Sequence, residues 1–154
     1  STPSVLKVQG STEMASLVQS SHATVPESHL VVDLSDRRVY LFQRAKLQVS
    51  YPIAIGQAGW ETPTGNFKVT QMQLDPHWKH PITGQIFPAG PDSPLGVRWI
   101  GFWSDKHNHI GFHGTNQDHL IGTAISHGCL RMRNQDIIQL YSQVVIGTPV
   151  TVRL

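Results

Sequence analysis

From residue 29 onward, runs rich in apolar, β-branched and aromatic residues are separated by short polar turns, a pattern typical of β-strands. Three such runs come first: Leu30–Leu34, Arg38–Phe42 and Leu47–Ile55. The connecting segments, Ser35-Asp36 and Arg44-Ala45-Lys46, are short enough to form hairpin turns. This pattern predicts an antiparallel meander at the start of the folded domain.

Further strands follow the meander, but one long irregular segment interrupts them. The stretch "TPTGNFKVTQMQ" predicts a Pro/Gly turn and a strand, and "RWIGFW" and "HIGFHGT" predict two more. Between them, the segment from Leu74 to Arg98 contains five prolines and three glycines and has no clear period. A loop of this length inside a compact domain is usually functional, so we expect it to act as a lid.

Helical periodicity is clear only near the end of the chain. Asn134 is a favourable N-cap residue, and Asp136 follows in the first turn. One apolar helix face is predicted from the residues Ile137, Ile138, Leu140, Tyr141, Val144 and Val145. Gly147 ends the helix, and "TPVTVRL" predicts a closing strand. The expected fold class is therefore mainly β (a β-rich α+β fold), with one helix near the C-terminal end.

Composition divides the chain into two parts. Residues 1–28 include 12 Ser, Thr or Pro and predict a linker or N-terminal extension, with a short helix at Thr12–Gln19. Residues 29–154 are expected to form a single globular domain. The chain begins at Ser1 without a Met, so a signal peptide or anchor that once preceded it would not be visible.

The charge pattern argues against nucleic acid and membrane as direct partners. The net charge is +2, and no run of Lys/Arg and no basic helix with interleaved aromatic residues occurs. No apolar stretch approaches the ~20 residues that a membrane span requires. Any membrane association would therefore come from a segment outside this chain, and we expect a monomer.

The one cysteine of the chain lies in the stretch "SHGCLRMR". A catalytic thiol must become a thiolate, so it needs a base or a positive environment, and it needs donors for the oxyanion that its attack creates. Gly128 allows a tight turn that would leave its own amide and that of Cys129 free to bind an oxyanion. His127 and Arg131 add polar or cationic groups nearby. This context indicates a nucleophile.

A base is available 16 residues upstream, where His113 stands in "GFHGT" at the end of an apolar strand. The simpler interpretations remain open: Cys129 could be a small core residue, and His113 could serve only as a hydrogen-bonding group. A zinc site is a second alternative, since six His or Cys residues fall between positions 107 and 129, but no HExxH or CxxC spacing occurs. A third is a non-catalytic cell-wall-binding module that uses the four tryptophans, Trp60, Trp78, Trp99 and Trp103.

The motifs "HGT" and "SHGCLRM", together with "YPIAIG" and "TPTGNFKV" upstream, resemble those of the L,D-transpeptidase catalytic domain, or YkuD domain. The resemblance covers roughly residues 29–154 and implies a curved sheet or β-sandwich with a helix after the cysteine motif. It also implies Cys-dependent acyl transfer on peptidoglycan stem peptides in the bacterial cell envelope, in the periplasm or the cell wall. The long proline-rich segment falls where the family carries its substrate-capping element.

The resemblance also implies roles for individual residues. Cys129 would be the nucleophile and His113 the general base, with its ring oriented by the carbonyl of Gly114. Arg131 would fix the loop or bind a substrate carboxylate. The oxyanion pocket would be shaped by Ser126, His127 and Gly128. We expect no cofactor and no metal. Because the residues do not distinguish an amine acceptor from water, an L,D-carboxypeptidase or hydrolase with the same site is the alternative.

Overall fold

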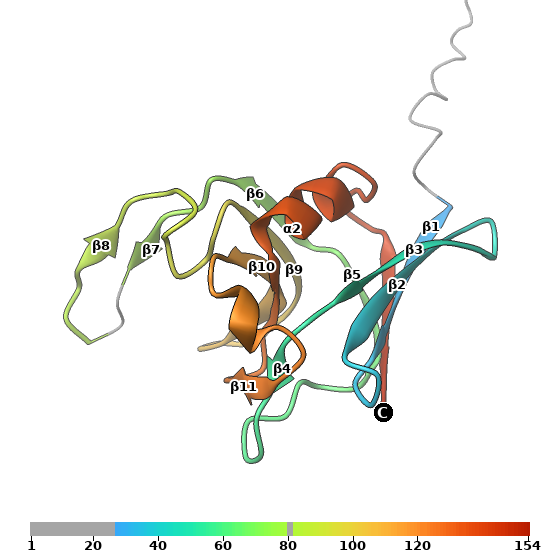
Figure 1. The fold of residues 1–154 in the computed structure, drawn as a ribbon, viewed down its shortest axis with the longest axis horizontal. Helices are drawn as coiled ribbons and strands as arrows, with labels where there is room; N and C mark the ends of the chain where they lie inside the picture. Colours follow the sequence, from blue (N-terminus) through green and yellow to red (C-terminus); the bar gives the residue numbers. More distant parts are fainter. Residues whose placement is uncertain (1–26, 80–81) are drawn as a thin grey trace, which may run out of the picture.

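Two open β-sheets enclose one hydrophobic core in the computed structural model, which describes residues 27–79 and 82–154 (Figure 1). The five-stranded sheet has the order β3-β2-β1-β13-β5 and comprises β1 (Ser28–Asp33), β2 (Arg38–Gln43), β3 (Lys46–Pro52), β5 (Gly65–Lys68) and β13 (Pro149–Arg153). The four-stranded sheet has the order β12-β10-β9-β6 and comprises β6 (Gln71–Leu74), β9 (Arg98–Ser104), β10 (His109–Thr115) and β12 (Leu130–Arg133). This architecture confirms the predicted mainly β fold.

Shorter elements complete the fold. Two small strand pairs are β4 (Ile55–Gly56) with β11 (Ala124–Ser126), and β7 (Trp78–Lys79) with β8 (Ile86–Phe87). Within residues 27–79 and 82–154, the helical elements are the 3-10 turn η2 (Asp118–Leu120) and the helix α2 (Asn134–Tyr141). Among the described residues, no helix is long and apolar enough to cross a bilayer.

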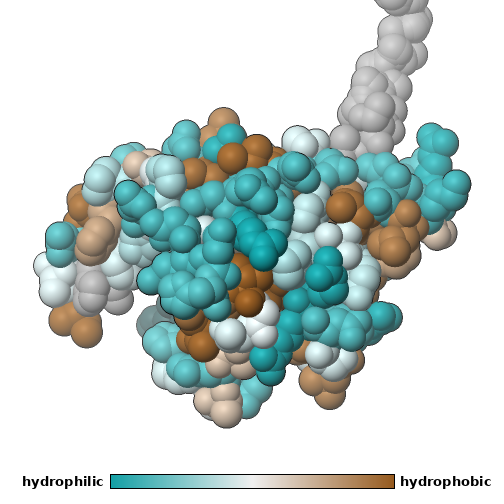
Figure 2. All heavy atoms as spheres, in the orientation of Figure 1, coloured by the Kyte–Doolittle hydropathy of each residue, from teal (hydrophilic) through white to brown (hydrophobic). Residues whose placement is uncertain are grey.

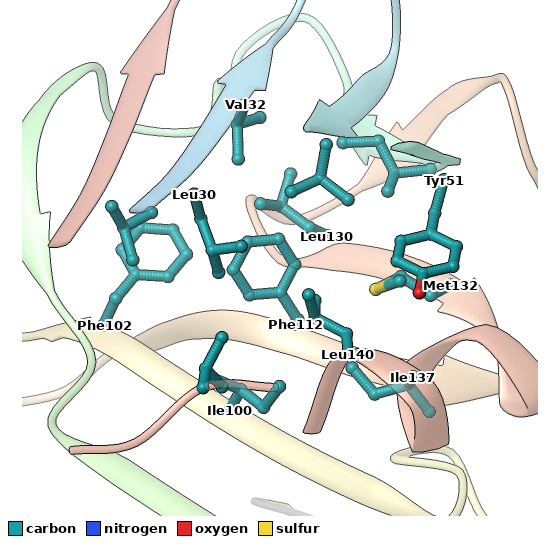
Figure 3. Packing of buried hydrophobic residues seen from close by; sticks show 14 of the residues in the cluster. Leu30, Val32, Tyr51, Ile100, Phe102, Phe112, Leu130, Met132, Ile137 and Leu140 are labelled. Carbon is teal, nitrogen blue, oxygen red and sulfur yellow. The ribbon is translucent and has the colours of Figure 1, made fainter. Parts of the chain in front are cut away.

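The core forms because each strand turns alternate residues inward. Phe112 of β10, Leu130 of β12 and Ile100 of β9 are fully buried, and they face Leu30 of β1 across the sandwich (Figure 3). Burying one such side chain stabilises the fold by about 1.5–3 kcal/mol. The helix α2 covers the end of this core and packs against β9, β10 and β12. These contacts hold β10 and β12, the strands that carry the chemistry of the candidate site.

The predicted antiparallel meander is confirmed in β1, β2 and β3, which pair in sequence. The third run was predicted to continue to Ile55, and this is wrong, because β3 ends at Pro52. Beyond Pro52 the chain leaves the five-stranded sheet and forms an antiparallel bridge between Ala54 and Arg131. Ile55 then pairs with Ala124 in β11. A single apolar run therefore crosses from one sheet to the neighbourhood of the cysteine.

The long proline-rich segment is more regular than predicted, since it contains the antiparallel pair β7–β8. The rings of Trp78 and Phe87 lie 5.3 Å apart across this hairpin. The hairpin extends away from the two sheets in Figure 1, and brown apolar atoms gather at that end of the molecule in Figure 2. Ile82 is 89% exposed and Ile86 is 64% exposed, so this part of the segment contributes little to the core.

The predicted helix exists but differs in its start and in its buried face. Asn134 is the first helical residue, and the preceding Arg133 occupies the N-cap position without a side-chain hydrogen bond. The helix has only eight residues, so Val145 lies beyond its end and is 39% exposed. Ile138 is also exposed, whereas Ile137 and Leu140 are fully buried. The helix predicted at residues 12–19 lies outside the described residues, and the domain boundary after residue 28 stays a prediction.

Candidate active site

The parallel pairing of β10 and β12 brings the two candidate motifs onto one face of the four-stranded sheet. His113 pairs with Arg131, and Phe112 pairs with Leu130. Because side chains alternate along a strand, Phe112 and Leu130 enter the core while His113 and Arg131 point to the opposite face. Cys129 lies two residues before Arg131 and shares that face. The two motifs, separate in sequence, are therefore neighbours in the fold.

The turn before Cys129 is held by its own side chains. The Ser126 hydroxyl donates to the Cys129 carbonyl over 2.6 Å and accepts the Gly128 N–H over 3.1 Å. Gly128 has φ of 118°, which side-chain-bearing residues rarely adopt, and a Cβ there would lie 2.8 Å from Cδ1 of Ile110. The expectation that the Gly128 amide is free for an oxyanion is wrong, because this amide is used to close the turn. The Cys129 amide is the remaining candidate of the two, and its availability to an oxyanion stays a prediction.

A second support of the cysteine turn comes from residues 54–62, which begin in the motif "YPIAIG" and end at the first residue of "TPTGNFKV". Ala54 and Arg131 exchange two backbone hydrogen bonds of 2.9 and 3.0 Å. The Thr62 hydroxyl donates to the Gly128 carbonyl over 2.8 Å, and it accepts the Gly56 N–H over 3.2 Å. The segment therefore holds both sides of the cysteine in place. The sequence marked both ends of this segment as parts of motifs, but it assigned no role in the site to Ala54, Gly56 or Thr62.

His127 lies on the outer side of this turn. Its ring is exposed and stacks on that of Trp60, with centroids 4.5 Å apart and planes inclined by 26°. A stacked ring has a fixed orientation, so the Trp60 contact limits how the turn can open. Trp60 itself is 53% exposed and contributes no core packing.

His113 is buried and has one hydrogen bond from its ring. Its Nδ1 donates to the Gly114 carbonyl over 2.9 Å, which confirms the predicted contact. Since a carbonyl can only accept, Nδ1 carries the proton and Nε2 is left as an acceptor. Burial lowers the pKa of His113 to about 4, and the positive charge of Arg131 also lowers it, while the Gly114 carbonyl opposes the change. No carboxylate of the described residues hydrogen-bonds to this ring. The imidazole is therefore neutral at neutral pH.

The Cys129 thiol is half-buried and donates to the His109 carbonyl over 3.5 Å. Burial raises the pKa of this thiol, while the Gly111 N–H and the charge of Arg131 oppose the rise. The resting site thus combines a neutral thiol with a neutral imidazole, rather than a thiolate–imidazolium pair. Such a site generates the thiolate only when a substrate is attacked, by proton transfer to the imidazole.

Arg131 supplies the positive charge next to both groups. Its Nε atom is buried and has no hydrogen-bond partner among the described residues. A buried guanidinium N–H without an acceptor is costly, and a bound anion or carbonyl oxygen would satisfy it. Arg131 is not among the residues that line the cavity next to Cys129, so its role in fixing the loop or binding a substrate carboxylate stays a prediction.

A cavity of about 440 Å³ opens above the thiol. Its walls come from the proline-rich segment, the β9–β10 hairpin and β6, and its lining residues are Gln71, Gln73, Trp78, Leu95, Trp99, His107, Asn108, His109 and Cys129. The segment predicted as a lid therefore reaches the candidate nucleophile, whereas its movement stays a prediction. The turn "DKHNH" at residues 105–109 forms one wall, which the sequence pattern did not predict, because periodicity carries no information about which loops meet in space.

The base of the proline-rich segment is fixed next to His113. The Gly114 N–H donates to the Leu95 carbonyl over 3.2 Å. The Asn134 side chain accepts the Val97 N–H and donates to the Pro91 carbonyl, each over 3.2 Å. Asn134 therefore ties this segment to the start of α2 instead of capping the helix. One wall of the cavity is thereby joined to the strand that carries the base.

The histidines considered for a zinc site point in different directions. His113 is buried against Trp99, with ring centroids 6.5 Å apart, while His127 stacks on Trp60 on the outside of the turn. Over residues 27–79 and 82–154, no three His, Cys, Asp or Glu side chains gather in a way that could hold a metal ion. The expectation of a metal-free and cofactor-free site stays a prediction.

Comparison with known proteins agrees with the motifs and the fold. A family model described as the L,D-transpeptidase catalytic domain, YkuD, matches residues 27–152. A putative L,D-transpeptidase YkuD of Bacillus licheniformis is 34% identical over 129 residues, which cover 84% of this chain and 67% of the relative.

Solved structures resemble this chain in fold. An L,D-transpeptidase from Mycobacterium smegmatis has a TM-score of 0.64 at 17% identity, over 83% of this chain and 59% of that one. L,D-transpeptidase 3 from Mycobacterium tuberculosis, in complex with a faropenem-derived adduct, has a TM-score of 0.64 at 20% identity, over 84% of this chain and 61% of that one. The chain thus spans about three fifths of these solved proteins. On the family match and the identity to its relatives, the chain belongs to the L,D-transpeptidase (YkuD) catalytic-domain family.

Proposed function

We propose that this domain is a cysteine acyltransferase that cross-links peptidoglycan stem peptides or exchanges their terminal D-amino acid. The observation that carries the proposal is the pairing of His113 with Arg131 across β10 and β12, with Cys129 on the same face beneath a cavity. Membership of the L,D-transpeptidase family and the relatives' names support the same substrate class. A core cysteine would not require a positive φ glycine, a braced turn and a neighbouring buried cation.

In the proposed reaction, the acyl donor is a stem tetrapeptide that enters the cavity above Cys129. The thiol rotates from the His109 carbonyl toward His113 and gives its proton to Nε2. Sγ then attacks the carbonyl carbon of the L-centre at the third stem position, typically a diaminopimelate residue. The bond to the terminal D-Ala breaks, and its amine leaves with the proton that His113 carried. A thioester on Cys129 remains.

The negative charge that develops on the attacked oxygen needs donors. The Gly128 N–H is already bonded to Ser126, so the Cys129 N–H is the proposed oxyanion donor. Ser126 and Gly128 act indirectly, because their mutual hydrogen bond sets the direction of that amide. His127 holds the outer side of the turn through Trp60. Arg131 binds a substrate carboxylate or carbonyl with its unpaired N–H.

The second half-reaction decides between the two candidate activities. Attack by the side-chain amine of a neighbouring stem on the thioester gives a 3→3 cross-link, whereas attack by water gives a carboxypeptidase. The half-buried thiol and the partly apolar cavity walls favour an amine that arrives with its own stem over bulk water. We propose the transferase as the main activity, acting as a monomer in the bacterial cell envelope.

Incubation of the purified protein with disaccharide-tetrapeptide muropeptides, followed by mass spectrometry, tests this function. The expected products are D-Ala and dimers linked between two third-position residues. Tripeptide without dimers would support the hydrolase instead. Intact tetrapeptide in the presence of a folded protein would contradict both activities.

A further inference from the structure

Cys129 and Gln71 line the same cavity from opposite edges of the four-stranded sheet. Gln71 of β6 pairs with Gly101 of β9, and Gly101 pairs with Gly111 of β10. Gly111 lies beside Cys129, and its N–H is directed at the thiol. A Cβ on Gly111 would meet the Ile100 carbonyl. A Cβ on Gly101 would meet the Trp99 ring and the Gln71 amide, so these two side chains lie over that strand. The path from Cys129 to Gln71 therefore follows the cavity that both residues line.

The amide of Gln71 is held in one orientation. The buried Trp99 ring donates from Nε1 to Oε1 of Gln71 over 3.0 Å. An indole N–H can only donate, so the atom that it meets must be the amide oxygen. The Nε2 of Gln71 is consequently turned elsewhere, and it has no protein partner within the described residues. Since Gln71 lines the cavity, this nitrogen is a fixed hydrogen-bond donor available to a ligand.

The separation suits the far end of a long side chain. Three strand spacings of ~4.8 Å put the backbones of Cys129 and Gln71 about 14 Å apart. The Gln71 amide reaches over Gly101 of β9, which leaves about two strand spacings, ~10 Å, to Cys129. An extended diaminopimelate covers about 7 Å from its attacked carbonyl to its other carboxyl carbon. The carboxylate of the leaving D-Ala is only three bonds from the attacked carbon and falls short of Gln71.

We propose that Gln71 determines acyl-donor specificity by donating from Nε2 to an oxygen at the side-chain end of the third stem residue. This inference rests on the proposed function and adds the group that the site recognises. The ligand class is a carboxylate or carboxamide at the end of an aliphatic side chain. Trp99 acts as a positioning residue, because it orients Gln71.

The substitution Gln71→Glu distinguishes recognition of the substrate by Gln71 from the hydrogen bond by which Gln71 supports the Trp99 ring. A glutamate still accepts the Trp99 N–H, so the packing of the indole is retained, but the donor is replaced by a second negative oxygen. Two tetrapeptide donors would be compared, one with a free side-chain carboxyl and one with that carboxyl amidated. We expect kcat/KM for the free acid to fall about tenfold or more relative to the amidated donor, since a carboxylate then faces a carboxylate. Gln71→Met, which lacks the donor, should raise KM for both donors and leave their ratio near that of the wild type.

Two further substitutions to glutamate separate recognition at Gln71 from a general effect of added negative charge. Gln48→Glu adds the same charge on β3, outside the cavity, and should leave the donor ratio unchanged. An unchanged ratio in Gln71→Glu, or an unchanged KM in Gln71→Met, would overturn the inference. An equal ratio change in Gln73→Glu would also overturn it, because a general negative potential would then be responsible. A folded wild type that is inactive on both donors would instead contradict the proposed function, and with it this inference.

Discussion

Nδ1 of His113 donates to the carbonyl oxygen of Gly114, the next residue in the chain, over 2.9 Å. This contact fixes the tautomer in which Nε2 accepts a proton, without the carboxylate that orients the histidine in many triads. A carbonyl stabilises an imidazolium less than a carboxylate would, and burial also disfavours the charged form. Such a base suits a thiol, which loses its proton more readily than a hydroxyl does.

The first prediction follows from this orientation. His113→Ala should lower turnover by about 10²–10⁴-fold, as expected when a general base is removed. Asp118→Ala should have little effect, because Asp118 lies in the exposed η2 turn and makes no contact with the ring. Steady-state kinetics of both variants on a tetrapeptide donor measure the difference. Similar losses in the two variants would point to a carboxylate-assisted mechanism instead.

The buried neutral imidazole also affects stability at acid pH. Because the pKa of His113 is about 4 in the folded chain and near 6.5 in the unfolded chain, the unfolded state binds more protons between these values. The contribution of His113 to the free energy of unfolding should be complete above pH 6.5 and should decrease as the pH falls from 6.5 to 4. The total loss from this group should be up to about 3 kcal/mol. Urea unfolding across this range would measure the loss.

The variant His113→Gln should reduce this dependence on pH, since it cannot take up the proton. His119→Gln serves as the matched control, because His119 is exposed in η2. Equal slopes of stability against pH in wild type and His113→Gln would show that other groups cause the acid sensitivity.

Most of the strand pattern could be predicted from the sequence, because alternation directly reflects burial on one side of a sheet. The approach of His113 to Cys129 could be inferred only from the resemblance and the neighbouring glycines. The parallel pairing of β10 and β12 that brings them together joins strands that are separated in the sequence, and no local pattern predicts which strands pair. The error at Asn134 has a physical reason as well. Its side chain has a competing set of backbone partners, at Val97 and Pro91, that no local helix rule includes.

The proline-rich segment gives the third prediction, through Trp78 at the cavity wall. Trp78→Ala should raise KM by about tenfold or lower turnover while changing the melting temperature little, as expected for a substrate-covering element. Ile86→Ala is the control from the same hairpin, because Ile86 is 64% exposed and does not line the cavity. A parallel collapse of activity and melting temperature in Trp78→Ala would make the hairpin a folding element.

The supporting segment at residues 54–62 illustrates what a one-dimensional pattern omits. Thr62 was part of a predicted turn and of the motif "TPTGNFKV" with no role assigned to it, yet its hydroxyl joins Gly56 to Gly128. Likewise, the Gly128 amide was expected to be free, and a single hydroxyl two residues earlier occupies it. Hydrogen bonds of this kind depend on which loops meet after folding, so they cannot be predicted from composition or periodicity.

The fourth prediction concerns metal ions. EDTA or 1,10-phenanthroline should leave activity on a tetrapeptide donor unchanged, because the proposed reaction uses only Cys129, His113 and the turn amide. Metal analysis of the untreated protein should give substoichiometric zinc. Loss of activity on chelation with recovery on adding Zn²⁺ would restore the zinc-site alternative.

The most direct test of the proposed mechanism is covalent modification of Cys129 itself. A carbapenem has a strained amide carbonyl that the activated thiol should open, so intact-mass spectrometry should detect one carbapenem per protein, mapped to the peptide that contains Cys129. Cys129→Ala should show no adduct and no transpeptidation, and it should keep the wild-type melting temperature because the thiol is only half-buried. An adduct that persists in Cys129→Ala, or activity that survives this substitution, would contradict the assignment of Cys129 as the nucleophile.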